Sequence, residues 1–270
     1  MTLRKLNLVA DWALATRRQA LRFALASCGG VIAGLAAVKA SQAGAAGEQV
    51  EVDAAIVLAA DVSRSIDDEE FALQRRGYAD AILSQQVIDA ISTGPCGAIA
   101  LAYAEWAGDG EEKLVVDWAV IRNQADARAF VAAMTPAPRA YVGRTAIGTA
   151  IDFSFALFAE TSFKTKRWVI DISGDGTSNQ GRLVTDARDA AIGAGAAING
   201  LAIFNKKAAA MGGYLALHTN PPGGLAHYYR ENVIGGEGAF VVQIDDFNTF
   251  GEALMRKLVN EVAGTQPTDG

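Results

Sequence analysis

Residues 52–65 read VDAAIVLAADVSRS, and this stretch decides the fold. We predict a strand over Val52–Ala60, because its centre is a continuous apolar run of the kind found in parallel strands buried on both faces. The chain leaves this strand through Asp61, Ser63 and Ser65, which alternate and therefore place a carboxylate and two hydroxyls on one side of the turn. The stretch predicts a buried parallel strand with oxygen-bearing side chains at its carboxyl end.

Five further strands are predicted downstream, and they alternate with amphipathic stretches in the manner of a sheet flanked by helices. The turn sequence GDGE (108–111) lies between the second strand and the third, so we expect these two strands to form a hairpin in which the third runs antiparallel. No repeat or linker interrupts residues 50–264, which we expect to form one doubly wound α/β domain. The predicted strands are Val52–Ala60, Ala98–Ala104, Leu114–Trp118, Arg167–Ile172, Ile198–Phe204 and Ala239–Ile244.

The connection from Lys206 to Gly238, between the fifth and sixth strands, is unusually long and contains one short helical stretch, Leu225–Asn232. It is either a surface connection or a loop that borders a binding face. Its two histidines, His218 and His227, have no third ligand at motif spacing, so we expect surface or structural roles for them and not a zinc site.

Composition narrows the function classes. The chain has 270 residues, of which 51% are hydrophobic and 20% charged, which excludes a disordered protein. Its net charge of −6 argues against nucleic acid as a partner, since phosphate binding needs clustered Lys and Arg. Two cysteines exclude a disulfide scaffold, and Cys96 is predicted to be a half-buried free thiol. Trp106 and Trp118 are predicted to be core or edge aromatics.

Residues 1–43 are predicted to be an export signal. The segment TRRQALR (16–22) resembles the twin-arginine signal S/T-R-R-x-F-L-K and departs from it at Ala20. An apolar run, Phe23–Val38, and the small-residue segment ASQA (40–43) follow, as in a cleavable signal. A general secretory route and an N-terminal membrane anchor remain alternatives. We expect a periplasmic or secreted mature chain without an integral membrane segment, with short tails at 44–49 and 265–270.

Two more segments carry oxygen-bearing side chains toward the end of the first strand. Asp175 follows the fourth predicted strand, and Thr145 precedes a predicted helix. In a doubly wound sheet, the carboxyl ends of such strands flank the crevice where ligands bind. Carboxylate and hydroxyl oxygens suit a hard divalent cation such as Mg²⁺. Each residue also has a plainer interpretation, since Ser63 or Ser65 could cap the following helix and Asp175 could form a turn.

The combination D-x-S-x-S at 61–65, a Thr within GRTAIGTA (143–150) and Asp-Gly at 175–176 resembles the metal-ion-dependent adhesion site (MIDAS) of von Willebrand factor type A (vWA) domains. This resemblance implies a six-stranded Rossmann-like sheet in the order 3-2-1-4-5-6, with a Mg²⁺, Mn²⁺ or Ca²⁺ ion at its top. It further implies that Ser63, Ser65 and Thr145 ligate through hydroxyls, while Asp61 and Asp175 ligate directly or through water. Gly174 departs from the pattern, because many relatives carry Thr there.

Other segments, including SGDG (173–176), INGLAI (198–203) and YYRENVIGG (228–236), resemble an exported bacterial branch of unknown function. The vWA resemblance implies a protein-binding module whose metal accepts a carboxylate from a partner protein, and not an enzyme. A metal-assisted hydrolase is the opposing hypothesis, although no general base stands at motif spacing. A third is an accessory subunit of a periplasmic enzyme with a structural metal site.

Overall fold

The computed structural model describes residues 49–159, 161–245 and 247–265. The predicted export signal, with Arg17 and Arg18, lies outside the described residues, as do most of the two predicted tails. No helix in the described part of the chain combines the length and apolar character that crossing a membrane requires.

Six strands form one sheet in the order β3-β2-β1-β4-β5-β6, which confirms the predicted order. Only the β2–β3 pair is antiparallel, as the short hairpin predicted. The third strand is longer than predicted and the sixth begins two residues later. The strands are β1 (Ala55–Asp61), β2 (Ile99–Trp106), β3 (Glu112–Ile121), β4 (Trp168–Gly174), β5 (Ala196–Ile203) and β6 (Val241–Ile244).

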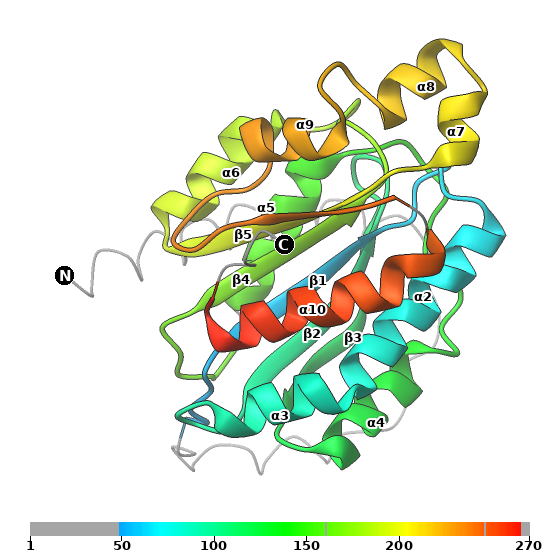
Figure 1. Cartoon of the computed structure of the whole chain (residues 1–270). Helices are drawn as coiled ribbons and strands as arrows, with labels where there is room; N and C mark the ends of the chain where they lie inside the picture. The colour runs from blue at the N-terminus through cyan, green and yellow to red at the C-terminus, as the bar shows by residue number, and fades with distance from the viewer. Residues whose placement is uncertain (1–48, 160, 246, 266–270) are drawn as a thin grey trace, which may run out of the picture.

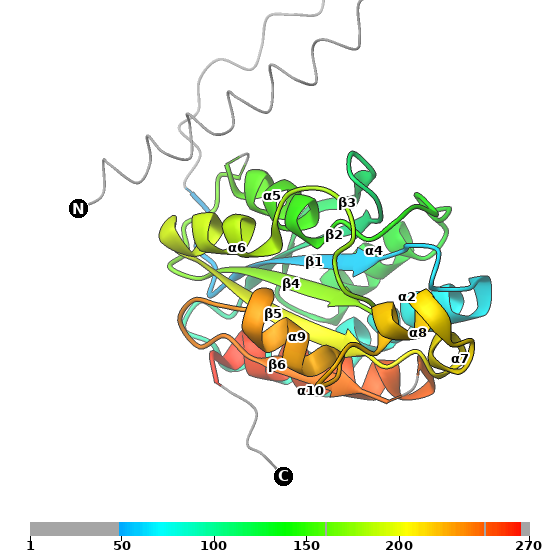
Figure 2. The ribbon, with the colours of Figure 1, turned by 90° about the horizontal axis from the view of Figure 1, so that it is seen from above.

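Helices cover both faces of this sheet (Figures 1 and 2). One face carries α2 (Asp68–Leu83), α3 (Gln85–Thr93), α4 (Gln124–Met134) and α10 (Phe250–Ala263), which follows the short 3-10 turn η1 (Phe247–Thr249). The other face carries α5 (Ile147–Phe158), α6 (Val184–Gly193) and α9 (Leu225–Asn232). Two short helices, α7 (Lys206–Ala210) and α8 (Gly213–Thr219), lie next to the start of α2, as Figure 1 shows.

The central strand β1 is buried along its whole length, as its apolar run predicted. Alternate side chains enter opposite cores: Ile56 and Leu58 pack toward α2 and α10, whereas Val57 and Ala59 pack toward α5. Ala60 pairs with Ser173 of β4, so β1 and β4 end at the same level of the sheet. This register brings the chain segments that follow the two strands to one edge.

The aromatic and cysteine predictions have different outcomes. Trp106 is buried, and Trp118 is half-buried at the edge against Phe158 and Phe163, which confirms their predicted core and edge roles. Cys96 is free but exposed, so the prediction of a half-buried thiol is wrong. It lies in a turn before β2 begins, where the chain has not yet entered the sheet.

Candidate metal centre

Asp61 is the last residue of β1, and its side chain is fully buried. Its Oδ1 accepts a hydrogen bond of 2.7 Å from the backbone N–H of Ser63, while its Oδ2 is buried without any hydrogen-bond partner. Burial raises the pKa of Asp61 well above its usual range, and the nearby charge of Asp175 raises it further. An orphaned carboxylate oxygen in the interior is costly unless a cation or donor comes to it.

Ser63 and Ser65 follow Asp61 but do not cap the next helix. The N-cap of α2 is Asp67, which accepts a 2.9 Å hydrogen bond from the N–H of Glu70 and donates its own N–H to Glu70 Oε2. This capping box satisfies the helix start by itself. The interpretation of either serine as the helix cap is therefore wrong, and both hydroxyls point elsewhere.

The hydroxyls of these serines meet the other two predicted site residues. Ser65 Oγ donates to Asp175 Oδ1 at 2.6 Å and lies 3.2 Å from Ser63 Oγ. Thr145 Oγ1, from the segment before α5, donates to Ser63 Oγ at 3.4 Å. The structure thus brings together side chains from three separate segments at the ends of β1 and β4. Asp61 joins the group through the backbone of Ser63.

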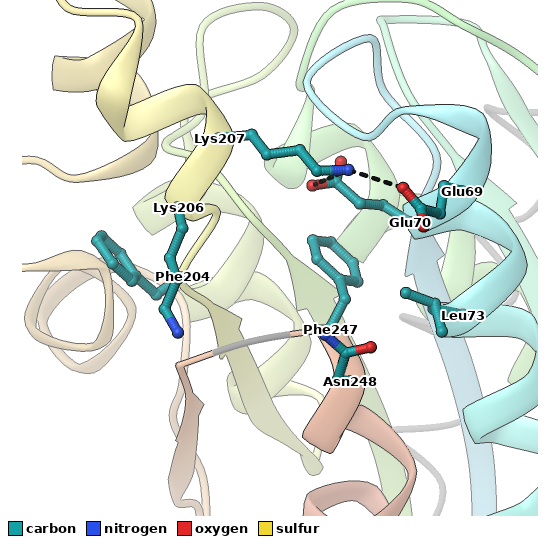
Figure 3. Close-up of a pocket in the computed structure, with 8 residues that line it drawn as sticks. All are labelled: Glu69, Glu70, Leu73, Phe204, Lys206, Lys207, Phe247 and Asn248. Carbon is teal, nitrogen blue, oxygen red and sulfur yellow. Dashed lines mark hydrogen bonds and ion pairs between the residues drawn. The ribbon is translucent and has the colours of Figure 1, made fainter.

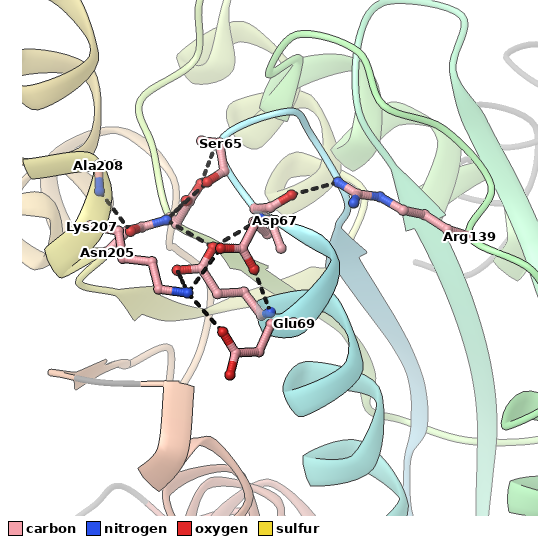
Figure 4. A network of polar contacts seen from close by, with 10 residues as sticks. Ser65, Asp67, Glu69, Arg139, Asn205, Lys207 and Ala208 are labelled. Carbon is pink, nitrogen blue, oxygen red and sulfur yellow. Dashed lines mark hydrogen bonds and ion pairs between the residues drawn. The ribbon is translucent and has the colours of Figure 1, made fainter. Parts of the chain in front are cut away.

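Asn205, which sequence reasoning missed, holds Asp175 from the opposite side. Its Nδ2 donates to Asp175 Oδ2 at 2.8 Å and to the carbonyl of Ser65 at 2.9 Å, and its Oδ1 caps α7 through the N–H of Ala208. Figure 4 shows Asn205 directed at Ser65, with Lys207 and Arg139 reaching the start of α2 from opposite sides. Burial raises the pKa of Asp175 to about 6, although the donors Ser65 and Asn205 oppose this shift. The only sequence signal for Asn205 was its position, as a polar residue directly after the fifth predicted strand.

His218 of α8 also lies at the site. It is 5% exposed, its Nε2 is 3.2 Å from Thr145 Oγ1, and its Nδ1 is 3.2 Å from Thr177 Oγ1. Burial lowers its pKa, so the imidazole is neutral at pH 7. Of the two predicted roles, His218 agrees with the structural one, because it is buried and contacts two threonines, whereas His227 is exposed and agrees with the surface one. A lone histidine 73 residues away from its contact leaves no spacing signal in the sequence.

Two glycines make room for the residues that sequence reasoning did not place here. A Cβ at Gly176 would lie 2.3 Å from His218 Nε2, and a Cβ at Gly174 would lie 2.7 Å from the phenol oxygen of Tyr229 and 2.9 Å from Asp61 Oδ2. Tyr229, from α9, is fully buried and its hydroxyl has no hydrogen-bond partner. The phenol of Tyr229 therefore takes the space that a side chain at position 174 would need.

The donor set fits a divalent cation. The hydrogen bonds to Asp61 and Asp175 come from neutral groups, namely the backbone of Ser63, the hydroxyl of Ser65 and the amide of Asn205. Two buried carboxylates with neutral donors favour a positive ion between them, and carboxylate and hydroxyl oxygens match Mg²⁺, Mn²⁺ or Ca²⁺. In the described ranges, no cluster of three or more His, Cys, Asp and Glu residues forms a conventional metal site. The candidate centre is of the mixed hydroxyl–carboxylate kind.

Surface features surround this centre. A pocket of about 210 Å³ lies between α2 and α7, where Lys207 reaches to Glu69 (Figure 3), and it shares Glu70 with the Asn205 network. On α7–α8, the ring of Tyr214 stacks on His218 with 5.7 Å between ring centroids. Large apolar side chains are exposed on α7–α8 and in the loops that precede α5 and α6: Val142, Leu183, Met211, Tyr214 and Leu217.

Residues 51–266 match a family model described as "Protein of unknown function (DUF1194)", and no curated protein matches the chain by sequence. Among solved structures, a mussel byssus proximal thread matrix protein with a zinc-occupied MIDAS motif has a TM-score of 0.50 at 16% identity, over 80% of this chain and 49% of that chain. The pilus adhesin SpaC of Lactobacillus rhamnosus GG has a TM-score of 0.54 at 13% identity, over 78% and 30%. A vWA protein of Catenulispora acidiphila scores 0.49 at 17% identity, over 79% and 43%. This chain thus spans less than half of the length of these proteins. The likeness to the byssus protein and to the pilus adhesin shows a shared fold.

Proposed function

The chain belongs to the family described as protein of unknown function (DUF1194) and has a vWA-like α/β fold, and on that premise we propose that it is an exported, divalent-cation-dependent protein-binding module. The observation that carries this proposal is the buried Oδ2 of Asp61, which has no hydrogen-bond partner. It belongs to the same site as the hydroxyls of Ser63, Ser65 and Thr145 and the carboxylate of Asp175. These five residues would hold Mg²⁺, with Mn²⁺ and Ca²⁺ as alternatives.

A bound cation would supply a Lewis-acidic position for one more anionic oxygen. Ser63, Ser65 and Thr145 would ligate through neutral hydroxyls, so the ion would keep its preference for a hard anionic oxygen at the open position. An acidic side chain of a partner protein is the ligand that the vWA resemblance implies there. The exposed Met211, Tyr214 and Leu217 beside the site would give a partner apolar surface to bury around that contact. The partner is therefore expected to present a carboxylate within an apolar patch.

The predicted export signal supports the same function. The predicted twin-arginine-like signal at residues 1–43 would deliver the folded domain to the periplasm or the medium. Partners are then other exported proteins or cell-surface proteins, and nucleic acid is not expected at a net charge of −6.

The test is capture of partners from periplasmic extract by the immobilised chain, in Mg²⁺ and in EDTA. Three matched baits are needed: the wild type, Asp61→Asn at the site, and Ser154→Ala, which alters a buried hydroxyl of α5 without a hydrogen-bond partner. A partner retained in Mg²⁺ by the wild type and by Ser154→Ala, but lost in EDTA and by Asp61→Asn, supports the proposal. If the partner is retained equally well in EDTA and by Asp61→Asn, the proposal is contradicted.

One observation favours a second candidate, a metal-assisted hydrolase. His218 Nε2 lies 3.2 Å from Thr145 Oγ1, and burial lowers its pKa, so its neutral imidazole would serve as a general base if a cation at this site supplied an activated water. Hydrolysis of ester and phosphoester substrates in Mg²⁺ or Mn²⁺, abolished in His218→Asn, would favour this candidate. If the chain is an accessory subunit instead, it should co-purify with one enzyme, and EDTA should not release that enzyme.

A further inference from the structure

A second cluster of charged residues lies away from the candidate metal centre, between α10 and the sheet. Lys257 of α10, Asp171 of β4 and Glu261 of α10 are all buried, with exposed fractions of 0%, 0% and 1%. Figure 1 shows α10 lying across the sheet, and the cluster lies under this helix. Buried Lys and carboxylates without solvent are rare, and here the amine of Lys257 contacts both carboxyl groups.

The contact between Lys257 and Asp171 is not an ordinary hydrogen-bonded ion pair. Nζ of Lys257 lies 2.5 Å from Asp171 Oδ1, yet neither oxygen of Asp171 receives a hydrogen bond of acceptable geometry. The amine is thus placed against the carboxyl group without being aligned to donate to it. By contrast, Lys257 does donate to Glu261 Oε1, at 2.5 Å.

Glu261 is held in position by a third side chain. Asn199 of β5 donates from Nδ2 to Glu261 Oε1 at 2.8 Å, and Asn199 Oδ1 accepts the N–H of Phe240 at 3.1 Å, which fixes the orientation of the amide. Oε2 of Glu261 is buried and has no partner, so it is available to hold a proton. The ring of Phe240 also covers Lys257, with Nζ 5.5 Å from its centroid.

We propose that Lys257 and Asp171 form an intramolecular isopeptide bond, an amide between Nζ and Cγ, with Glu261 as the residue that accepts and returns protons. This is a modification site distinct from the candidate metal centre. It covalently ties the C-terminal helix α10 to β4 of the central sheet.

The reaction needs no oxidant or co-reactant and balances within the cluster. Glu261 takes a proton from the ammonium of Lys257, and the amine lone pair attacks Cγ of the neutral Asp171 carboxylic acid. The C–O bond then breaks, and the hydroxyl leaves as water with a second ammonium proton. One of the three ammonium protons stays on the amide nitrogen and one stays on Glu261. The cluster is neutral before and after the step, as its burial requires.

The protonation states agree with this scheme. Burial and the negative charge of Glu261 raise the pKa of Asp171 to about 7, so its neutral form is populated at neutral pH. Burial alone would lower the pKa of Lys257, but the carboxylates of Asp171 and Glu261 raise it. The amine is therefore freed only by direct transfer of its proton to Glu261, which explains why both carboxyl groups are needed.

The test is a tryptic digest of the denatured full chain, analysed by tandem mass spectrometry. An isopeptide bond blocks cleavage after Lys257 and joins residues 168–182 to residues 257–270 in one branched peptide, lighter by one water than its two parts. We expect this branched peptide in the wild type and its loss in Lys257→Arg, which keeps the charge but lacks the amine. Glu261→Gln should leave most chains without the bond.

The chain contains its own control. Lys164 and Glu51 form an equally close ion pair, but both are exposed and solvated, so no branched peptide should join them. Unmodified peptides 168–182 and 258–270 from the folded wild type would overturn the proposal, whether or not the variants fold. Loss of water within 257–270 alone would place the bond on Glu261 and overturn the assignment to Asp171.

Discussion

The hydroxyl of Ser65 donates a 2.6 Å hydrogen bond to Asp175 Oδ1, although the two residues are 110 positions apart in the chain. Ser65 follows β1 and Asp175 follows β4, and these strands are neighbours at the point where the strand order reverses direction along the sheet. The contact therefore joins the two chain segments that border the crevice at which doubly wound folds bind ligands. Because the donor is neutral, this contact leaves the two buried carboxylates of the site with their charge unbalanced.

The first prediction is that a divalent cation stabilises the fold. Binding relieves the repulsion between Asp61 and Asp175 and satisfies Asp61 Oδ2. At 100-fold excess over the dissociation constant, the gain should be about 2–3 kcal/mol, which raises Tm by roughly 5–10 °C for a domain of this size. Thermal unfolding in Mg²⁺, Mn²⁺, Ca²⁺ and EDTA measures it. Identical melting curves in all four would remove the support for a metal site.

The second prediction concerns pH. Burial raises the pKa of Asp61 and raises that of Asp175 to about 6, so the metal-free folded state holds protons that the unfolded chain has released. These groups make the metal-free fold most stable at low pH. The contribution of Asp175 is lost as pH rises from about 4 through 6, and that of Asp61 is lost as pH rises through its own raised pKa. Protons and the cation compete for the same oxygens, so the Mg²⁺-dependent rise in Tm should be large at pH 8 and small at pH 5. A rise that is equal at both pH values would contradict this competition.

The sheet was predictable because its signals are local. The apolar run that became β1 and the short link between β2 and β3 each specify one feature of the topology without reference to distant residues. The D-x-S-x-S segment, Thr145 and Asp175 were found because each directly follows a strand or precedes a helix, and the fold brings such ends to one edge.

His218, Asn205 and Tyr229 could not be found in the same way. They come from the fifth strand's end and from the long connection 206–238, and their contacts with the site depend on how α7, α8 and α9 pack. Each is a single polar residue with no partner at motif spacing. Of the two interpretations left open for that connection, the loop at the edge of the site agrees with the position of His218.

The third prediction separates metal binding from folding. Asp61→Asn keeps an oxygen for the N–H of Ser63 but removes one of two repelling charges. The metal-free variant should be at least as stable as the wild type at pH 7, while Mg²⁺ affinity falls at least about 100-fold by calorimetric titration. If Asp61→Asn instead unfolds the metal-free protein, Asp61 is a structural residue and the adhesion proposal fails.

Thr145→Ala should act differently from Asp61→Asn. Both carboxylates remain, so the cation still binds, but one hydroxyl is lost beside His218. We expect the affinity for the captured partner to fall by about tenfold or more, and the affinity for Mg²⁺ to fall less than that. Ser154→Ala, the matched control on α5, should change neither affinity.

The fourth prediction tests export. If Arg17 and Arg18 are read as a twin-arginine signal, replacing both with Lys should leave a precursor about 4 kDa heavier in the cytoplasm. Cell fractionation and immunoblotting of the wild type and the double variant measure this. Normal processing of the double variant would assign the chain to the general secretory route.

The last prediction concerns the pair Gly174 and Tyr229. A Cβ at position 174 would lie 2.7 Å from the Tyr229 hydroxyl and 2.9 Å from Asp61 Oδ2, and the buried ring of Tyr229 has little room to move. Gly174→Ala should therefore destabilise the protein by about 1–3 kcal/mol in urea unfolding with EDTA and also weaken Mg²⁺ binding by displacing Asp61.

Tyr229→Phe removes the oxygen that the new methyl group would meet. That hydroxyl has no hydrogen-bond partner, so Tyr229→Phe alone should cost little, under about 1 kcal/mol. Added to Gly174→Ala, it should restore much of the lost stability, which appears as a coupling energy of about 1 kcal/mol or more in the double-mutant cycle. Mg²⁺ affinity should recover only in part, because the contact between the new Cβ and Asp61 Oδ2 remains. Additive effects of the two substitutions would mean that the phenol of Tyr229 does not occupy the space beside Gly174.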